Sequence, residues 1–127
     1  MRVGEDILVV DDEPELQEAL RDLLELEGYD VRVARDGIEA LERVEAAKPR
    51  LIVLDLMMPR MDGYGFVAEL ERRNLRDEIP IIVLTADGKA STKADHLGAA
   101  AGVAKPFDVT MLLGEVARLM RRPGDND

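Results

Sequence analysis

Short apolar runs rich in β-branched residues recur along the chain, and longer stretches with helical periodicity separate them. This alternation constrains the fold more than any other feature, because apolar runs of about four to eight residues suit strands. Five strand and helix pairs in succession predict an α/β protein with a parallel sheet and right-handed crossovers. The expected strands are Ile7–Val10, Val31–Ala34, Leu51–Leu54, Pro80–Leu84 and a weakly apolar Gly102–Ala104.

The first two separating stretches have the spacing of amphipathic helices. In the first, apolar residues at i, i+3, i+4, i+7 and i+8 share one face of a helix that ends at Gly28. These residues are Leu16, Ala19, Leu20, Leu23 and Leu24. The second helix begins after Asp36, a favoured N-cap residue type, and must end before Pro49. Its inward residues are expected to be Ile38, Leu41 and Val44.

Three further helices are expected in the second half of the chain, over about residues 64–73, 91–97 and 109–121. Gly98 closes the middle one, which has little apolar periodicity. Asp108 is a candidate N-cap for the last one. The apolar faces of the first and last of these helices consist of Phe66, Val67 and Leu70, and of Leu112, Leu113, Val116 and Leu119.

The three middle runs among the expected strands, 31–34, 51–54 and 80–84, are apolar almost throughout and do not alternate between apolar and polar residues. That pattern is typical of strands that helices cover on both faces. The sequence therefore predicts a doubly wound, three-layer α/β domain with a five-stranded parallel sheet.

The chain of 127 residues fits one domain. Its composition, 46% hydrophobic and 35% charged, is typical of a globular protein. We assign residues 1–121 to the domain. Residues 122–127 are polar and contain Pro123 and Gly124, so we interpret them as a C-terminal tail or the start of a linker.

Charge and residue types exclude several classes of function. A formal net charge of −10 repels phosphate backbones and anionic lipid surfaces, so we expect no direct binding to nucleic acid or membrane. No stretch approaches the roughly 18 apolar residues of a membrane span, and no signal-peptide run follows Met1. The absence of Cys removes disulfide and thiolate chemistry and suits a cytoplasmic protein, which is what we expect.

Polar residues stand where the expected strands end. The carboxyl ends of parallel strands meet at one edge of the sheet, and the reversal of strand order there opens the usual ligand crevice of such folds. Residues distant in sequence would meet in that crevice. They are Asp11, Asp12 and Glu13 after the first strand, Asp55 after the third, Thr85 after the fourth and Lys105 after the fifth.

Gathering these carboxylates in one crevice requires a compensating cation. Two carboxylates about 4 Å apart repel by roughly 4 kcal/mol at an effective dielectric constant of about 20. Mg²⁺ suits such a cluster, because it combines one or two carboxylates with phosphate oxygens and water. The aspartate cluster therefore predicts Mg²⁺, with Lys105 as a second, fixed positive charge.

Four motifs stand at these strand ends: Asp11-Asp12, Asp55-Leu-Met-Met-Pro-Arg-Met-Asp-Gly63, Thr85-Ala86 and Lys105-Pro106-Phe107. Each alone is more often a solvated loop, turn or cap. Together, in this order and spacing, they resemble response-regulator receiver domains, the CheY-like family of two-component signalling, over about residues 5–121. The resemblance implies a flavodoxin-like fold with strand order 2-1-3-4-5 and a cis Lys105–Pro106 bond.

The resemblance also implies a role for each residue of the site. Asp55 would accept a phosphoryl group from a sensor histidine kinase, a phosphotransfer protein or a small phosphodonor. Asp12, Asp55 and the Met57 backbone carbonyl would bind Mg²⁺, and Asp11 would act largely through a water. Lys105 would contact the phosphoryl oxygens. A downstream effector protein or domain would then bind the altered surface.

In this family a Thr hydroxyl moves onto a phosphoryl oxygen after phosphorylation, and an aromatic residue three positions before the lysine turns inward. Thr85 fits the first position, but Gly102 occupies the second. We therefore expect movement of the loop from Thr85 to Ala90, which Gly88 would ease, to alter the face made by the fourth helix, fifth strand and fifth helix. Alternatively, a partner side chain fills the groove that Gly102 leaves. The same face would permit a homodimer.

Two other function classes fit part of the pattern. A Mg²⁺-dependent aspartate-nucleophile phosphohydrolase also places an Asp after a parallel strand, but that class has a second Asp two residues later, where this chain has Met57. A degenerate receiver, acting as a constitutive binding module, would not need the intact site residues. We therefore expect a phosphoaccepting signalling domain that assists its own phosphorylation and dephosphorylation, and not an enzyme.

Overall fold

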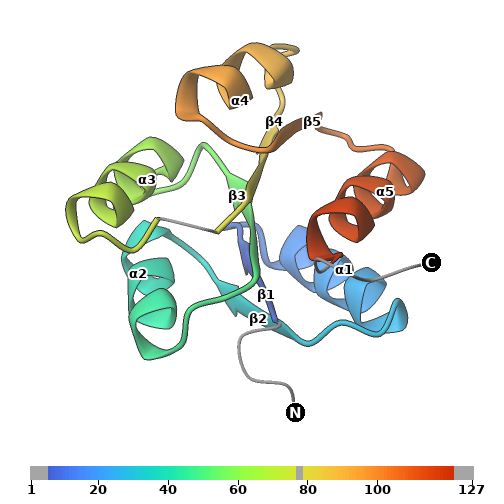
Figure 1. The fold of residues 1–127 in the computed structure, drawn as a ribbon. Helices are drawn as coiled ribbons and strands as arrows, with labels where there is room; N and C mark the ends of the chain where they lie inside the picture. Colours follow the sequence, from blue (N-terminus) through green and yellow to red (C-terminus); the bar gives the residue numbers. More distant parts are fainter. Residues whose placement is uncertain (1–5, 77–78, 122–127) are drawn as a thin grey trace.

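Five parallel strands form one sheet, and their order across it is β2-β1-β3-β4-β5 (Figure 1). The structure is a computed structural model that describes residues 6–76 and 79–121. Each neighbouring pair of strands is parallel and in continuous register. The expected order 2-1-3-4-5 is confirmed. The strands are β1 (Ile7–Val10), β2 (Val31–Ala34), β3 (Leu51–Asp55), β4 (Ile81–Thr85) and β5 (Ala101–Ala104).

Helices cover both faces of the sheet and make the outer two of three layers (Figure 1). α1 and α5 pack on one face, and α2, α3 and α4 pack on the other. This arrangement confirms the doubly wound α/β architecture that the sequence predicts. The helices are α1 (Pro14–Leu26), α2 (Gly37–Ala46), α3 (Gly63–Arg72), α4 (Ala90–Leu97) and α5 (Val109–Met120).

Every residue of β1, β3 and β4 is buried, which confirms for β3 and β4 that helices cover both faces. The same prediction for β2 holds less well, because β2 is an edge strand and three of its four residues are half-buried. Successive side chains of a strand point to opposite faces, because the strand has a period of two residues. Leu8 and Val10 of β1 pack in the cluster with α2, α3 and α4. Ile7 and Val9 pack in the cluster with α1 and α5. The sheet therefore separates two hydrophobic clusters.

Side-chain caps set the starts of three helices. Asp36 and Asp108, the predicted caps, accept hydrogen bonds from backbone amides three residues later. Asp62 caps α3 in the same way. α4 ends at Gly98, as predicted, in the left-handed conformation with φ 67°. These caps satisfy amides at the helix ends that have no partner inside the helix.

Several predicted boundaries were wrong by one residue. The third strand was predicted to end at Leu54, but β3 includes Asp55, which pairs in register with Leu84 of β4. Thr85 is likewise the last residue of β4 and does not follow it. Pro80 lies before β4, because proline has no amide hydrogen for the ladder. β5 and α4 begin one residue earlier than predicted, and α5 ends one residue earlier.

Two residues that the helical pattern placed inward lie at the surface. Ile38 is 38% exposed, so its predicted inward position was wrong. The buried face of α2 starts at Gly37, and Ile38 is rotated from it by about 100° around the helix axis. Ala19 is exposed, whereas Leu20 and Leu24 of the same helix are buried. In both helices the face that is buried is narrower than the face that the apolar residues cover.

The predicted tail, residues 122–127, lies outside the described residues. The last described helix, α5, ends at Met120. Within residues 6–76 and 79–121, no helix has the length and apolar character needed to cross a bilayer.

Candidate functional site

The carboxyl ends of β1, β3, β4 and β5 converge at one edge of the sheet. Asp55 and Thr85 are the last residues of β3 and β4. Asp11 follows β1 and Lys105 follows β5. Backbone hydrogen bonds extend the alignment past the strands: the Asp11 amide donates to the Ala34 carbonyl (3.0 Å), and the Lys105 amide donates to the Thr85 carbonyl (2.9 Å). The parallel register therefore brings these four side chains to one place.

Three acidic side chains gather at this edge. Each of Asp11, Asp12 and Asp55 offers a carboxylate oxygen, and these atoms lie within 4.8 Å of one another. Asp11 is fully buried, Asp55 is 4% exposed and Asp12 is half-buried. Carboxylate oxygens at this spacing can hold a divalent cation. A donor set of oxygens alone favours a hard ion such as Mg²⁺ over a soft one.

The Lys105 ammonium faces the same carboxylates. Its Nζ lies 3.4 Å from Oδ2 of Asp11, 3.4 Å from Oδ2 of Asp55 and 3.4 Å from Oε1 of Glu13. These contacts are longer than charge-assisted hydrogen bonds, which are typically about 2.7–2.9 Å. One ammonium shared at this distance neutralises the cluster only in part, so negative charge remains for another cation.

Backbone amides orient two of the carboxylates. Oδ1 of Asp11 accepts from the Glu13 amide at 2.9 Å, and Oδ1 of Asp55 accepts from the Met57 amide at 3.2 Å. In both residues Oδ2 is the atom that faces Lys105. Oδ2 of Asp11 is buried and, beyond the 3.4 Å ion pair with Lys105, has no hydrogen-bond partner among the described residues. A cation, or a water bound to one, would satisfy this orphaned acceptor, so the residues fit a metal ion.

Burial and repulsion shift the pKa values of the site. Burial is the main reason that the pKa of Asp55 rises to about 6, and the nearby charge of Asp11 adds to it. Burial also raises the pKa of Asp11. Burial alone would lower the pKa of Lys105, but the carboxylates of Asp11 and Asp55 outweigh it and raise that pKa. Protons and a divalent cation therefore compete for the same carboxylates.

Gln17 of α1, which sequence reasoning missed, helps to hold the site. Its side-chain amide donates to the Asp11 carbonyl at 3.1 Å and to the Ala34 carbonyl at 3.0 Å. These bonds join α1 to the ends of β1 and β2. In the sequence Gln17 is one of several polar residues on an amphipathic helix, and nothing in its spacing marks it.

The methionines that follow Asp55 divide between surface and core. Met57 is 67% exposed, whereas Met58 is 9% exposed and belongs to the core. The Met57 amide donates to Asp55, which places this residue at the acidic cluster. The metal contact of the Met57 carbonyl stays a prediction.

The Thr85 side chain is 3% exposed, and its hydroxyl donates to Oδ1 of Asp87 at 3.2 Å. Asp87 also accepts from the Lys89 amide at 3.0 Å and forms an ion pair with Lys93 of α4. The hydrogen bond from Lys93 is the main reason that the pKa of Asp87 lies below its ordinary value. Sequence reasoning missed Asp87 and Lys93, because their contact depends on how the loop folds back against α4.

Gly102 lies where α4 approaches β5 closely. A Cβ atom at this position would lie 2.2 Å from the Ala90 carbonyl oxygen and 3.1 Å from Cβ of Ala94. The start of α4 therefore leaves no room for a side chain, least of all an aromatic one. In this arrangement Thr85 has no aromatic partner at position 102. A groove of about 260 Å³ remains between α4 and α5, lined in part by Ala94, Gly102 and Glu115.

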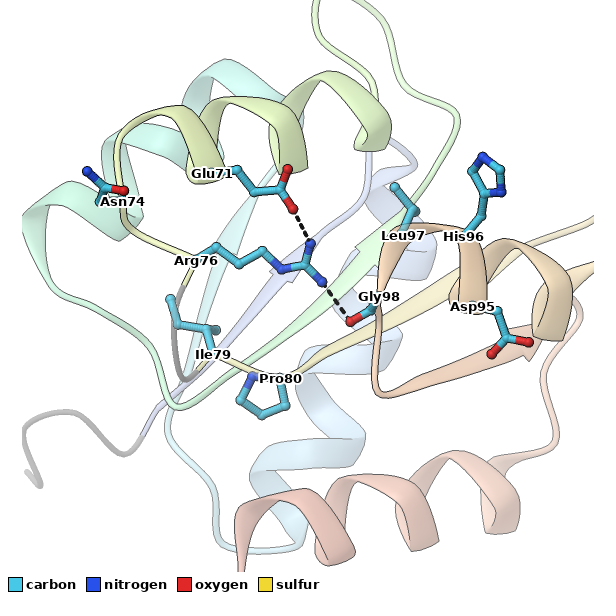
Figure 2. Close-up of a pocket in the computed structure, with 9 residues that line it drawn as sticks. All are labelled: Glu71, Asn74, Arg76, Ile79, Pro80, Asp95, His96, Leu97 and Gly98. Carbon is cyan, nitrogen blue, oxygen red and sulfur yellow. Dashed lines mark hydrogen bonds and ion pairs between the residues drawn. The ribbon is translucent and has the colours of Figure 1, made fainter.

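A larger pocket, of about 900 Å³, lies at the opposite edge of the sheet (Figure 2). Ile79 and Pro80, just before β4, and Gly98, just after α4, help to line it. Arg76 joins its two sides, because it donates to Oε2 of Glu71 at 2.8 Å and to the Gly98 carbonyl at 2.7 Å (Figure 2). This pocket faces away from the acidic cluster, and its arginine is already paired.

Comparison with known families identifies the protein family to which this arrangement belongs. The sequence model of the response regulator receiver domain matches residues 7–117. The chain belongs to the response regulator receiver family. The matched range contains all five strands of the receiver and the whole acidic cluster with its lysine. The resemblance indicated by the four motifs is confirmed.

Curated relatives of the receiver are response regulators. Response regulator MprA of Mycobacterium leprae (strain TN) is 42% identical over 123 residues, which cover 95% of this chain and 53% of the relative. Response regulator MprA of Mycobacterium ulcerans (strain Agy99) is 43% identical over 118 residues, which cover 91% of this chain and 50% of the relative. The chain therefore spans about half the length of the curated relatives it matches.

Solved receiver structures share the fold. A putative response regulator from Chloroflexus aurantiacus J-10-fl has a TM-score of 0.85 at 32% identity and covers 94% of this chain and 99% of its own. The receiver domain of NtrX from Brucella abortus has a TM-score of 0.82 at 30% identity, with coverage of 91% and 98%. Chemotaxis response regulator CheY4 of Vibrio cholerae has a TM-score of 0.82 at 29% identity, with coverage of 93% and 99%. The CheY-like fold is confirmed, and the Lys105–Pro106 bond is cis, as the resemblance implied.

Proposed function

We propose that this receiver accepts a phosphoryl group on Asp55 in the presence of Mg²⁺ and that the change alters a protein-binding surface. The group would come from a sensor histidine kinase or a phosphotransfer protein, and a downstream effector protein or domain would bind the altered surface. One observation carries the proposal: the Asp55 carboxylate lies within 4.8 Å of two other aspartates and 3.4 Å from a lysine ammonium. Phosphoryl transfer requires this combination of a positioned nucleophile and sites for cations.

The acidic cluster supplies the residues that would hold the ion. Asp12, Asp55 and the Met57 carbonyl would bind Mg²⁺ directly, and Asp11 would act largely through a water. The ion, when bound, supplies positive charge to the oxygens of the transferring group. The orphaned Oδ2 of Asp11, which has no hydrogen-bond partner among the described residues, supports this assignment.

Asp55 is the nucleophile of the proposed reaction. One of its carboxylate oxygens forms a bond to phosphorus, while the bond from phosphorus to the donor's histidine nitrogen, or to the acyl oxygen of a small phosphodonor, breaks. The bonding electrons leave with the donor atom, so the reaction needs no proton transfer from Asp55. At pH 7 a pKa of about 6 leaves Asp55 mostly ionised. Lys105, 3.4 Å from Asp55, would neutralise charge on the phosphoryl oxygens.

Thr85 would connect the reaction to α4. Its hydroxyl would leave Asp87 and donate to a phosphoryl oxygen, so Asp87 would lose one of the contacts that hold it beside Lys93. The loop from Thr85 to Ala90 would then move, and Gly88, with φ 79°, eases that movement. Because α4 begins at Ala90 and lies against β5, the movement would alter the face made by α4, β5 and α5.

NMR spectroscopy with and without beryllofluoride, which mimics a bound phosphoryl group, tests this part of the proposal. We expect chemical-shift changes in residues 86–113. Changes confined to the strand ends, with none in that range, would contradict the proposed movement.

The same face is our proposed contact for a homodimer. Asp95 of α4 and Arg118 of α5 line the groove between these helices, so a symmetric contact could pair opposite charges. We also propose a cytoplasmic location and a receiver domain over residues 1–121. The net charge of −10 supports the absence of direct contacts with nucleic acid and membrane.

The two rival functions make different demands. A phosphohydrolase of the aspartate-nucleophile class would have a second Asp where this chain has Met57, and membership of the receiver family favours signalling over that enzyme class. A degenerate receiver would bind its partner without taking up a phosphoryl group. We therefore propose a signalling domain that assists its own phosphorylation and dephosphorylation.

Intact-mass spectrometry after incubation with acetyl phosphate tests the proposed function. The wild-type chain should gain one phosphoryl mass when Mg²⁺ is present and none when it is chelated. Asp55→Ala should gain none. Asp22→Asn, which changes an exposed aspartate of α1, is the matched control and should behave as wild type. A folded wild-type chain that gains no mass under either condition would support the degenerate receiver.

A further inference from the structure

The loop between β3 and α3, residues 56–62, follows Asp55 and is closed at its base by α3. The Gly63 amide donates to the Leu56 carbonyl at 3.0 Å. A Cβ atom at Gly63 would lie 2.8 Å from Cα of Leu56 and 3.0 Å from the Asp55 carbonyl oxygen. The start of α3 therefore packs directly against the end of β3, and this contact fixes the two ends of the loop. The residues in the middle of the loop are held by other contacts.

α2 supplies a second support for this loop. The Gly37 amide donates to the Met61 carbonyl at 2.9 Å. A Cβ atom at Gly37 would lie 2.6 Å from Cγ of Met61, so the first turn of α2 touches the loop directly. The Met61 amide in turn donates to the Pro59 carbonyl at 2.7 Å, which makes this part of the loop a tight turn.

Asp36 and Arg60 make a third connection between the same two segments. Nε of Arg60 lies 2.7 Å from Oδ2 of Asp36. The other carboxylate oxygen, Oδ1, caps α2 by accepting from the Glu39 amide at 2.9 Å. The Asp36 side chain is 4% exposed, so this carboxylate is a buried anchor with both oxygens engaged. Burial alone would raise the pKa of Asp36, but the Glu39 amide and Arg60 outweigh it and lower that pKa.

The backbone of Arg60 is unusual. Its φ of 65° lies in the left-handed region, which Gly and Asn enter far more easily than a long side chain does. Among the described residues, the other residue besides glycine with positive φ is Asn74, with φ 57°. Asn tolerates that conformation, whereas Arg needs a compensating contact. The ion pair with Asp36 is such a contact. It holds the Arg60 side chain in place and so stabilises the loop conformation in which Arg60 has positive φ.

We propose that Asp36 and Arg60 are a positioning pair that holds the loop after Asp55 in the shape that binds Mg²⁺. Only Met58 and Pro59 separate Arg60 from Met57, whose carbonyl is a proposed ligand and whose amide orients Asp55. Fixing Arg60 therefore limits where the Met57 backbone can lie. The pair does not touch the reacting atoms, and it acts through the loop. This inference rests on the proposed function, because Mg²⁺ binding is part of both.

Three substitutions test the pair, and a fourth serves as the control. Arg60→Gly removes the guanidinium and, because glycine adopts positive φ without strain, does not disturb the backbone. Asp36→Asn removes the charge but keeps an N-cap side chain. Arg60→Lys keeps a positive charge without the planar group that binds a carboxylate. Asn74→Gly makes the same backbone change at the end of α3, away from the loop.

Two measurements are made on each chain: amide hydrogen exchange within residues 57–61 without metal, at every position except Pro59, and the dissociation constant for Mg²⁺ by titration calorimetry. Arg60→Gly should exchange these amides faster and bind Mg²⁺ about tenfold more weakly. Asp36→Asn should do the same, and the double variant should be no weaker than either single variant, because both remove one interaction. Arg60→Lys should recover part of the affinity. Asn74→Gly should match wild type.

Phosphoryl uptake from acetyl phosphate at saturating Mg²⁺ should change less than about twofold in Arg60→Gly, because a positioning pair affects metal binding more than the transfer step. Exchange and Mg²⁺ affinity equal to wild type in Arg60→Gly would overturn the inference. A wild-type chain that neither binds Mg²⁺ nor takes up a phosphoryl group would overturn the proposed function instead. In that case amide exchange within residues 57–61 still tests whether the pair holds the loop. Faster exchange in Arg60→Gly supports this contact, and unchanged exchange overturns it.

Discussion

The two edges of the sheet use charge in opposite ways. At the amino-terminal edge, Arg76 contacts Glu71 at 2.8 Å and the Gly98 carbonyl at 2.7 Å, and its side chain is 17% exposed (Figure 2). At the carboxyl-terminal edge, Lys105 lies 3.4 Å from each of the carboxylates around it. Oδ2 of Asp11, also at this edge, has no hydrogen-bond partner among the described residues.

The paired charges at the amino-terminal edge stabilise the fold, whereas the unbalanced carboxylates at the carboxyl-terminal edge can bind a ligand. A short, fully formed contact such as that of Arg76 joins two elements and is complete in the folded protein. A buried cluster with more carboxylates than cations opposes folding, and the same imbalance attracts an added cation. The raised pKa values of Asp11 and Asp55 at the carboxyl-terminal edge are therefore expected of a functional site.

Removing carboxylates at the carboxyl-terminal edge should have the largest effect. We expect Asp11→Asn combined with Asp12→Asn to lower the rate of Mg²⁺-dependent phosphoryl uptake by about 100-fold or more, because the cation loses two of its carboxylates. Time courses of intact mass with acetyl phosphate measure this rate. Arg76→Gln at the other edge should keep the wild-type rate, and an equal loss there would remove the distinction between the edges.

Asp55→Asn should stabilise the metal-free protein near neutral pH. The pKa of Asp55 is about 6 in the folded protein against an ordinary value of 3.8, so the folded state binds this proton more tightly than the unfolded state. Above pH 6 the folded protein therefore holds an unfavourable buried charge. Asn removes that charge, and we expect the free energy of unfolding to rise by about 3 kcal/mol.

The gain from Asp55→Asn should shrink as the pH falls from 6 and disappear below 3.8, where the acid is neutral in both states. Urea unfolding with a chelator present, at pH 7.5 and at pH 4, measures both values. A variant equal to wild type at pH 7.5 would mean that the carboxyl-terminal edge carries no excess charge in the folded protein.

Mg²⁺ binding should weaken in acid. Between pH 7 and pH 5 the ionised fraction of Asp55 falls about tenfold, because its pKa of about 6 lies between them. We expect the dissociation constant for Mg²⁺ to rise by about the same factor, since the ion displaces the proton. Calorimetric titrations at the two pH values measure it, and an affinity independent of pH would contradict competition at Asp55.

Arg76→Gln should have the smallest effect, a loss of about 1 kcal/mol in the free energy of unfolding, because its hydrogen bonds to Glu71 of α3 and to the Gly98 carbonyl after α4 are broken. Chemical denaturation measures it. Arg72→Gln, which removes a guanidinium that is 67% exposed, is the control and should change stability by less than about 0.5 kcal/mol.

Local pattern predicted most of the fold. The continuous apolar runs of β3 and β4 indicated burial on both faces, because a strand exposed on one face would alternate. The errors fall at Asp55, Thr85 and Ala101, where pairing with a neighbouring strand decides how far a strand extends. The error at Ile38 has a similar origin, because contact with the sheet sets which face of α2 is buried.

Most of the candidate site was also predictable, since each of its main residues stands where an apolar run stops. Gln17, Arg60 and Asp87 were not, because nothing in the residues beside them indicates their partners. Gln17 and Arg60 act on segments 17 to 24 residues away in the chain. Asp87 acts through a loop that turns back to α4. Local composition contains no sign of such contacts.

The sequence by itself determined the alternation of strands and helices and the chemical groups that stand at the carboxyl edge. Those features depend on which residues avoid water, and that preference belongs to each residue and its near neighbours. Only the tertiary structure decided that Oδ2 of Asp55 faces Lys105, that the pKa of Asp55 rises to about 6, and that α4 leaves no room for a side chain at position 102. Distances and burial of this kind arise when segments far apart in the chain pack together.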